Sequence, residues 1–94
     1  MPWKETSLPQ LARELGVDYE QTRQKHKLIA LIVGERKRQE LSQATLAQRV
    51  GVTQSRIAQI ESGIGTRRMT FDVLLRVLTA LGYEVRFSAR RRAA

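Results

Sequence analysis

Residues 41–63 read LSQATLAQRVGVTQSRIAQIESG, and this stretch decides the fold of the chain. Ser42 and Thr53 belong to the residue types that cap helix N-termini, and each precedes a short run whose apolar residues have helical spacing. Gly51 lies between the two runs, where glycine permits the positive φ angle that a sharp turn requires. The stretch therefore predicts two short helices joined by a glycine turn.

The apolar residues of this stretch have structural roles in such a helix pair. Ala47 is small, which suits a point where two helices cross closely, and Val52 is expected to pack under the turn. The residues that we expect on the inward face are Leu46, Ala47, Val50, Ile57 and Ile60.

The polar residues of the stretch are candidates for DNA contact, because this layout is typical of helix-turn-helix proteins, whose second helix enters the major groove. Gln pairs with adenine and Ser with several bases, while Gln43, at the start of the first helix, suits phosphate. Arg56 suits guanine or phosphate, and the residues after the second helix suit backbone contacts that carry no sequence information. The residues that we expect to contact DNA are Gln43, Thr53, Gln54, Ser55, Arg56, Gln59, Ser62, Thr66, Arg67 and Arg68.

The composition fits one small domain that meets an anionic partner. The chain has 94 residues, of which 41% are hydrophobic, and its formal net charge is +8. Acidic and basic residues balance within residues 1–26, so the whole basic excess lies in and around the helix pair and after it. This placement suits phosphate binding, although a basic balance alone also occurs in ribosomal, membrane-surface and merely soluble proteins.

The sequence argues against catalysis and against metal or cofactor chemistry. There is no cysteine, which excludes disulfides and thiolate zinc sites. The single histidine, His26, lies between two lysines and has no carboxylate cluster beside it. We therefore expect no catalytic residue, no metal and no cofactor, and hence a protein that is not an enzyme.

The chain shows no sign of a membrane segment or a signal peptide. Its longest apolar run, from Leu28 to Val33, is far too short to span a bilayer. The N-terminal residues lack the apolar run of a signal peptide. We expect a cytoplasmic, nucleoid-associated protein without a membrane partner.

Three further helices are expected outside the central pair. Leucines spaced helically over residues 8–15, with Ser7 as cap, predict the first, and residues 19–39 predict a long second helix capped by Asp18. Residues 71–81, with Thr70 as cap, predict the last helix of the chain.

The segment after the last helix has the spacing of a strand. Tyr83, Val85 and Phe87 alternate with polar residues, which is a period of two. Because a lone strand cannot satisfy its ladder groups within one protomer, we expect it to pair with a second copy or with a sheet edge of a partner. The alternative is an extended, frayed tail. Residues 89–94, with three arginines in a row, are expected to form a basic disordered tail.

A short internal sequence similarity suggests a second interpretation of the N-terminal region. Residues 11–17, LARELGV, resemble residues 46–52, LAQRVGV. A second DNA-binding unit is one interpretation, but Thr22 and Lys25 would then occupy the positions of the inward isoleucines of the central pair. A helix that packs or binds a partner is the favoured interpretation.

The central stretch closely resembles the Xre/Cro type of helix-turn-helix, as in lambdoid phage repressors. The resemblance rests on SQAxLAQxVGxTQ over residues 42–54 and on QxExG over residues 59–63. In that family an ion pair ties the first helix of the domain to the end of the recognition helix. By resemblance, Arg36 and Glu61 would form this structural pair, the alternative being two exposed charges.

The flanks resemble HigA-type and HipB-like antitoxins of bacterial toxin–antitoxin systems, on the strength of DYE at residues 18–20 and LxxLGYEV at residues 78–85. The resemblance implies a DNA-binding antitoxin that dimerises on a palindromic operator, represses its own operon and neutralises a RelE/HigB-like toxin, a small basic ribonuclease. A stand-alone Xre-family transcriptional repressor without a toxin partner is the alternative. A third interpretation is a bridging or RNA-associated module that uses the fold without recognising bases.

Together these inferences predict an all-α fold, namely a five-helix lambda-repressor-like helix-turn-helix domain with one short C-terminal β-strand that pairs between chains. Residues 1–17 would form an N-terminal helical extension, residues 18–88 the domain with its strand, and residues 89–94 the basic tail. The expected partners are double-stranded DNA, a second copy of the chain and the toxin.

Overall fold

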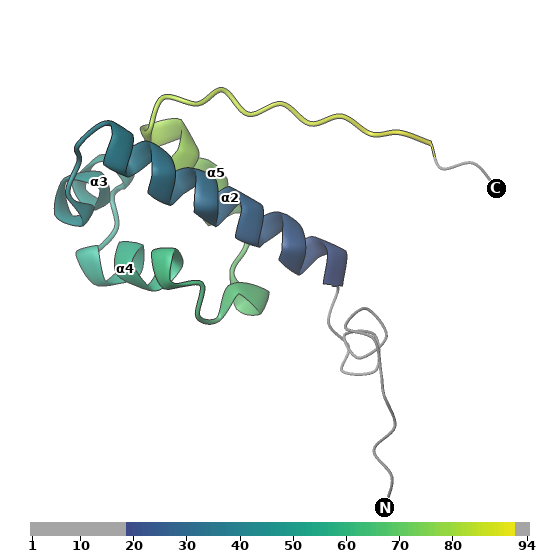
Figure 1. Ribbon diagram of the computed structural model, residues 1–94, viewed down its shortest axis with the longest axis horizontal. Helices are drawn as coiled ribbons and strands as arrows, with labels where there is room; N and C mark the ends of the chain where they lie inside the picture. Colours follow the sequence, from purple (N-terminus) through teal and green to yellow (C-terminus); the bar gives the residue numbers. More distant parts are fainter. Residues whose placement is uncertain (1–18, 92–94) are drawn as a thin grey trace, which may run out of the picture.

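Four α-helices and one 3-10 turn form the part of the chain that this computed structural model describes, residues 19–91. The elements follow in the order α2 (Tyr19–Arg38), α3 (Gln43–Val50), α4 (Gln54–Ser62), η1 (Thr66–Arg68) and α5 (Phe71–Ala80). α2 crosses the middle of the molecule, with α3 and α4 near its C-terminal end and α5 packed along it (Figure 1). The helix expected over residues 8–15 lies outside the described residues, and none of the described helices is long and apolar enough to cross a membrane.

The central helix pair begins and turns where its sequence predicts. The Ser42 Oγ accepts a hydrogen bond from the Thr45 N–H at 3.0 Å, and the Thr53 Oγ1 accepts one from the Arg56 N–H at 3.1 Å. Gly51 ends α3 at a φ of 85°, in the left-handed region that favours glycine. Helices of eight and nine residues are too short to be stable alone, so their stability comes from tertiary packing.

The core joins both short helices to α2 and α5. The predicted inward residues of α3 and α4 are confirmed, because all of them are buried. They pack with Ile29 and Ile32 of α2 and with apolar residues of α5 in one cluster. The remaining buried members of the cluster are Met69, Leu74, Val77, Leu78 and Leu81. The domain therefore presents α3 and α4 on a rigid base.

The predicted fold of five helices with a C-terminal strand is wrong, because the described residues contain no strand; they hold four helices, at the places expected for the last four of the five. Residues 83–91 instead run extended, back toward the beginning of α2 (yellow in Figure 1). Tyr83 and Val85 pack partly against the core, whereas Phe87 is 78% exposed. At Tyr83 and Val85 the alternation thus records which side of an extended chain touches the core. A strand also requires a ladder of backbone hydrogen bonds with a second segment.

A cluster of polar side chains ties the start of this C-terminal segment to α2. The Tyr83 hydroxyl donates to Glu35 Oε2 at 3.2 Å, and the Gln39 amide donates to Glu35 Oε1 at 2.8 Å and to the Leu81 carbonyl at 2.7 Å. Hydrogen bonds to Glu35 lower its pKa to about 2, and the bond from Arg38 has a larger effect than the bond from Gln39. Burial, helped by the nearby charge of Glu35, raises the pKa of the Tyr83 hydroxyl. The C-terminal segment therefore leaves the domain in a defined direction.

Candidate nucleic-acid interface

The two sides of α4 differ sharply in exposure. Ile57 and Ile60 are fully buried, whereas the polar residues on the other side reach solvent. Because a helix has 3.6 residues per turn, positions 55, 59 and 62 lie above one another on the outward side. We call this side, together with the first residue of the helix, the recognition face; it consists of Gln54, Ser55, Gln59 and Ser62, all of them exposed.

The N-terminal end of α4 adds hydrogen-bond donors to this face. Thr53 caps the helix, and its Oγ1 accepts a hydrogen bond from the Arg56 N–H. The N–H groups of Gln54 and Ser55 belong to the first turn, in which backbone donors have no partner within the helix. The positive end of the helix dipole acts at the same place, so the start of α4 favours acceptor groups and negative charge.

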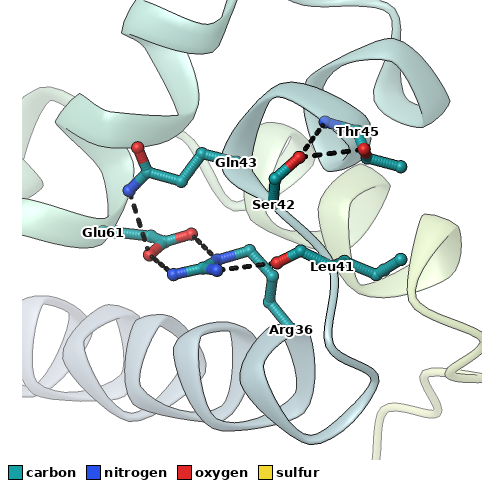
Figure 2. Close-up of polar contacts among 6 residues, drawn as sticks. All are labelled: Arg36, Leu41, Ser42, Gln43, Thr45 and Glu61. Carbon is teal, nitrogen blue, oxygen red and sulfur yellow. Dashed lines mark hydrogen bonds and ion pairs between the residues drawn. The ribbon is translucent and has the colours of Figure 1, made fainter.

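An ion pair fixes α4 against α2 (Figure 2). Arg36 Nε and Nη2 donate to the two carboxylate oxygens of Glu61 at 2.6 and 2.8 Å, and Nη1 donates to the Leu41 carbonyl at 2.8 Å. The two side chains are only 13% and 8% exposed. The hydrogen bond to Glu61 raises the pKa of Arg36, although burial acts against it. This bidentate geometry holds the end of α4 in one orientation.

Gln43 joins the same network from the start of α3. Its Nε2 donates to Glu61 Oε1 at 3.3 Å, and the side chain is partly buried (Figure 2). A carboxylate only accepts hydrogen bonds, so Gln43 must turn its NH2 group toward it. The second N–H of that group and the amide oxygen stay available, which is compatible with a phosphate contact through the N–H.

Two side chains of α4 are bonded to each other at the edge of the recognition face. Arg56 Nη1 donates to Gln59 Oε1 at 2.9 Å, across the three-residue spacing at which helical neighbours meet. Gln59 therefore does not offer both ends of its amide equally to a DNA base.

A comparison with protein families matches residues 35–87 to the family described as Helix-turn-helix. The match covers more than half of the chain and includes α3, α4, α5 and the end of α2. The chain belongs to the Xre-like helix-turn-helix family. The comparisons with curated proteins and with solved structures gave no significant match.

Membership of the Xre-like family makes the protein a DNA-binding transcription regulator. It makes α4 the recognition helix, because the second helix of the motif enters the major groove. The family is regulatory and not typically enzymatic. Within the described residues, no group of three or more His, Cys, Asp or Glu side chains has an arrangement that would hold a metal ion.

The residues that follow the recognition helix divide into those that hold the loop and those that reach solvent. The Ser62 Oγ donates to the Gln59 carbonyl at 2.7 Å and accepts from the Ile64 N–H at 3.1 Å. The Thr66 side chain is buried, at 3% exposure, and its hydroxyl donates to the Gly63 carbonyl. Arg68 is exposed, and the side chain of Arg67 lies outside what the structure describes. Thr66 thus shapes the turn rather than facing a DNA backbone.

Two hydrogen bonds of this site were not predicted from the sequence, namely the one between Arg56 and Gln59 and the one between Gln43 and Glu61. The bond between Arg56 and Gln59 was predictable, since residues three apart on a helix face are neighbours. The bond between Gln43 and Glu61 joins residues 18 positions apart. No local pattern signals such a pair.

Proposed function

We propose that this regulator recognises one palindromic operator sequence as a homodimer and represses transcription from it. The observation that carries the proposal is the recognition face, whose four exposed polar side chains stand on a helix held by a partly buried ion pair. Gln and Ser side chains supply the donors and acceptors that direct readout of base edges requires. The place of action is the cytoplasm, where the operator lies.

The size of the recognition helix supports the proposed dimer. α4 has nine residues, and a helix of that length spans only about 13 Å, so a single copy meets few base pairs. Two copies related by a twofold axis would place their recognition helices in successive major grooves, roughly 34 Å apart. Light scattering of the free protein and of its operator complex tests this point, and a monomer on the operator would contradict it.

The test of sequence-specific binding is a selection from random DNA followed by affinity measurements at one fixed salt concentration. Gln54→Ala should cost about 1–3 kcal/mol on the selected operator and little on random DNA. Gln48→Ala is the matched control, because it removes the same side chain from an exposed position of α3 outside the recognition face. Equal losses on both DNAs for Gln54→Ala would contradict the assignment of the recognition face.

A second proposed activity is that of an antitoxin, which neutralises a RelE/HigB-like ribonuclease and represses its own operon. It is supported by the resemblance of the flanks and by an apolar groove whose lining residues belong to α2, α5 and the C-terminal segment. The apolar members of the lining are Leu28, Phe71, Leu75, Val85 and Phe87. Such a groove leaves α3 and α4 available for DNA.

Purification from nuclease-treated cells separates the antitoxin from a stand-alone repressor. A stoichiometric small basic protein that cleaves mRNA, and that this chain inhibits, would support the antitoxin. A homodimer without such a partner would favour the repressor that acts alone.

A further inference from the structure

The bond between Arg56 and Gln59 restricts what the recognition helix offers to DNA. Arg56 Nη1 and Gln59 Oε1 are 2.9 Å apart, on the same helix and one turn from each other. Gln59 is exposed on the recognition face, and Arg56 lies at its edge with part of its side chain buried. The inference that follows rests on the proposed sequence-specific binding.

The chemistry of the two groups settles which end of the amide is occupied. A guanidinium carries five N–H donors and no acceptor, so the amide atom that faces it must be the oxygen. The Oε1 atom keeps a second lone pair, but the guanidinium beside it brings positive charge and further N–H donors, which oppose the approach of another donor such as the N6–H of adenine. The NH2 group is therefore the end of the amide that meets a base more favourably, and Gln59 acts mainly as a donor.

A glutamine that acts mainly as a donor has a different base preference from one whose amide is free. The bidentate pairing of Gln with adenine needs the amide oxygen to accept from N6–H while the amide N–H donates to N7. Guanine instead presents two acceptors, O6 and N7, which match N–H donors. We propose that Arg56 sets the base preference of Gln59, so that the protein favours guanine over adenine at the base pair that Gln59 meets.

Arg56 does not have to release Gln59 when DNA binds. One of its five donors is used in the bond, and the other four remain available for a phosphate oxygen. The Arg56 backbone is held in place as well, because its N–H donates to the Thr53 cap. Contact with the DNA backbone and restraint of Gln59 are therefore compatible.

The experiment compares duplexes of the selected operator that differ at one base pair. That pair is found first, as the position where Gln59→Ala loses discrimination while the rest of the site is still recognised. Dissociation constants are then measured for the wild type, for Arg56→Met and for Arg49→Met at one salt concentration. Arg56→Met keeps an apolar stem but removes the donors, and Arg49→Met removes one positive charge from an exposed position of α3.

We expect the wild type to bind the duplex with guanine about tenfold more tightly than the duplex with adenine. In Arg56→Met the ratio should fall to about one or reverse, because the freed amide can then pair with adenine. Arg49→Met should weaken binding to both duplexes equally and keep the wild-type ratio, since loss of a charge acts on every sequence alike.

Several results would overturn the proposal. A wild-type preference for adenine at this pair would do so, even if Arg56→Met failed to fold. If folded Arg56→Met keeps the wild-type ratio of the two dissociation constants, the proposal is wrong as well. It is also wrong if Gln59→Ala keeps full discrimination between bases at every position of the operator while Gln54→Ala loses discrimination at one. If the selection enriches no sequence at all, the proposed function itself fails, and that outcome is distinct from the others.

Discussion

Replacing Glu61 by Gln should destabilise the domain strongly, because it leaves the Arg36 guanidinium desolvated and without its carboxylate. The Arg36 and Glu61 side chains are 13% and 8% exposed, so the remaining charge does not regain full hydration. Only one of the two bonds that join the charged groups, at 2.6 and 2.8 Å, can form in the variant, since the new amide has a single acceptor oxygen and no negative charge.

The magnitude follows from this burial. Removing one partner of a buried ion pair costs about 3–5 kcal/mol. Water reaches a small part of both side chains and relieves some of this cost, so we expect a loss of about 2–4 kcal/mol in the free energy of unfolding. The total free energy of unfolding of a domain of this kind is roughly 5–15 kcal/mol, and the expected loss corresponds to a decrease in Tm of about 10–20 °C.

Urea and thermal unfolding at pH 7, followed by circular dichroism, measure this loss. The double variant Arg36→Met/Glu61→Met removes both charges and should recover most of the stability, because an apolar pair has no charge to desolvate. Glu84→Gln is the exposed control. It breaks an ion pair with Arg86 whose side chains are 84% and 78% exposed, and such pairs contribute little.

The reasoning is refuted if Glu61→Gln costs less than about 1 kcal/mol. It is equally refuted if the double variant is no more stable than Glu61→Gln, since the loss would then not arise from the uncompensated charge of Arg36.

Three further predictions concern Gly51, Gly34 and Glu35. Gly51→Ala should destabilise the domain by about 1–2 kcal/mol, since Gly51 has a φ of 85°. Gly34→Ala should stabilise it by about 0.5–1 kcal/mol, because Gly34 lies inside α2 and nothing is within 4 Å of the added methyl group. Urea unfolding measures both effects, and a stabilising Gly51→Ala would contradict the first prediction. Glu35 should titrate near pH 2 in a carbon-13 NMR titration, because Arg38 and Gln39 bind its charged form. As its pKa is lower in the folded state, its contribution to stability is present above pH 4.5 and is lost as the pH falls toward 2, whereas a midpoint near 4.5 would show that these bonds do not form in solution.

The parts of the fold that sequence predicted correctly depend on short-range signals. A capping serine or threonine, a glycine at the turn and apolar residues three or four positions apart all act within a few residues of one another. The prediction of a strand at residues 83–88 failed because the alternation also arises where an extended chain lies with one side on a core, as at Tyr83 and Val85. Whether a ladder forms depends on a second segment, which the local pattern does not encode.

By itself, the sequence determined that α3, a glycine turn and α4 form one unit and that polar residues lie on the outer side of α4. Only the tertiary structure decided what those side chains do. It buried the Thr66 hydroxyl and turned the NH2 group of Gln43 to Glu61, 18 positions away, whereas the pair of Arg36 with Glu61 was already implied by the family resemblance. The physical reason is that hydrogen bonds between distant residues depend on how α2, α3 and α4 pack, and that packing is a property of the whole core.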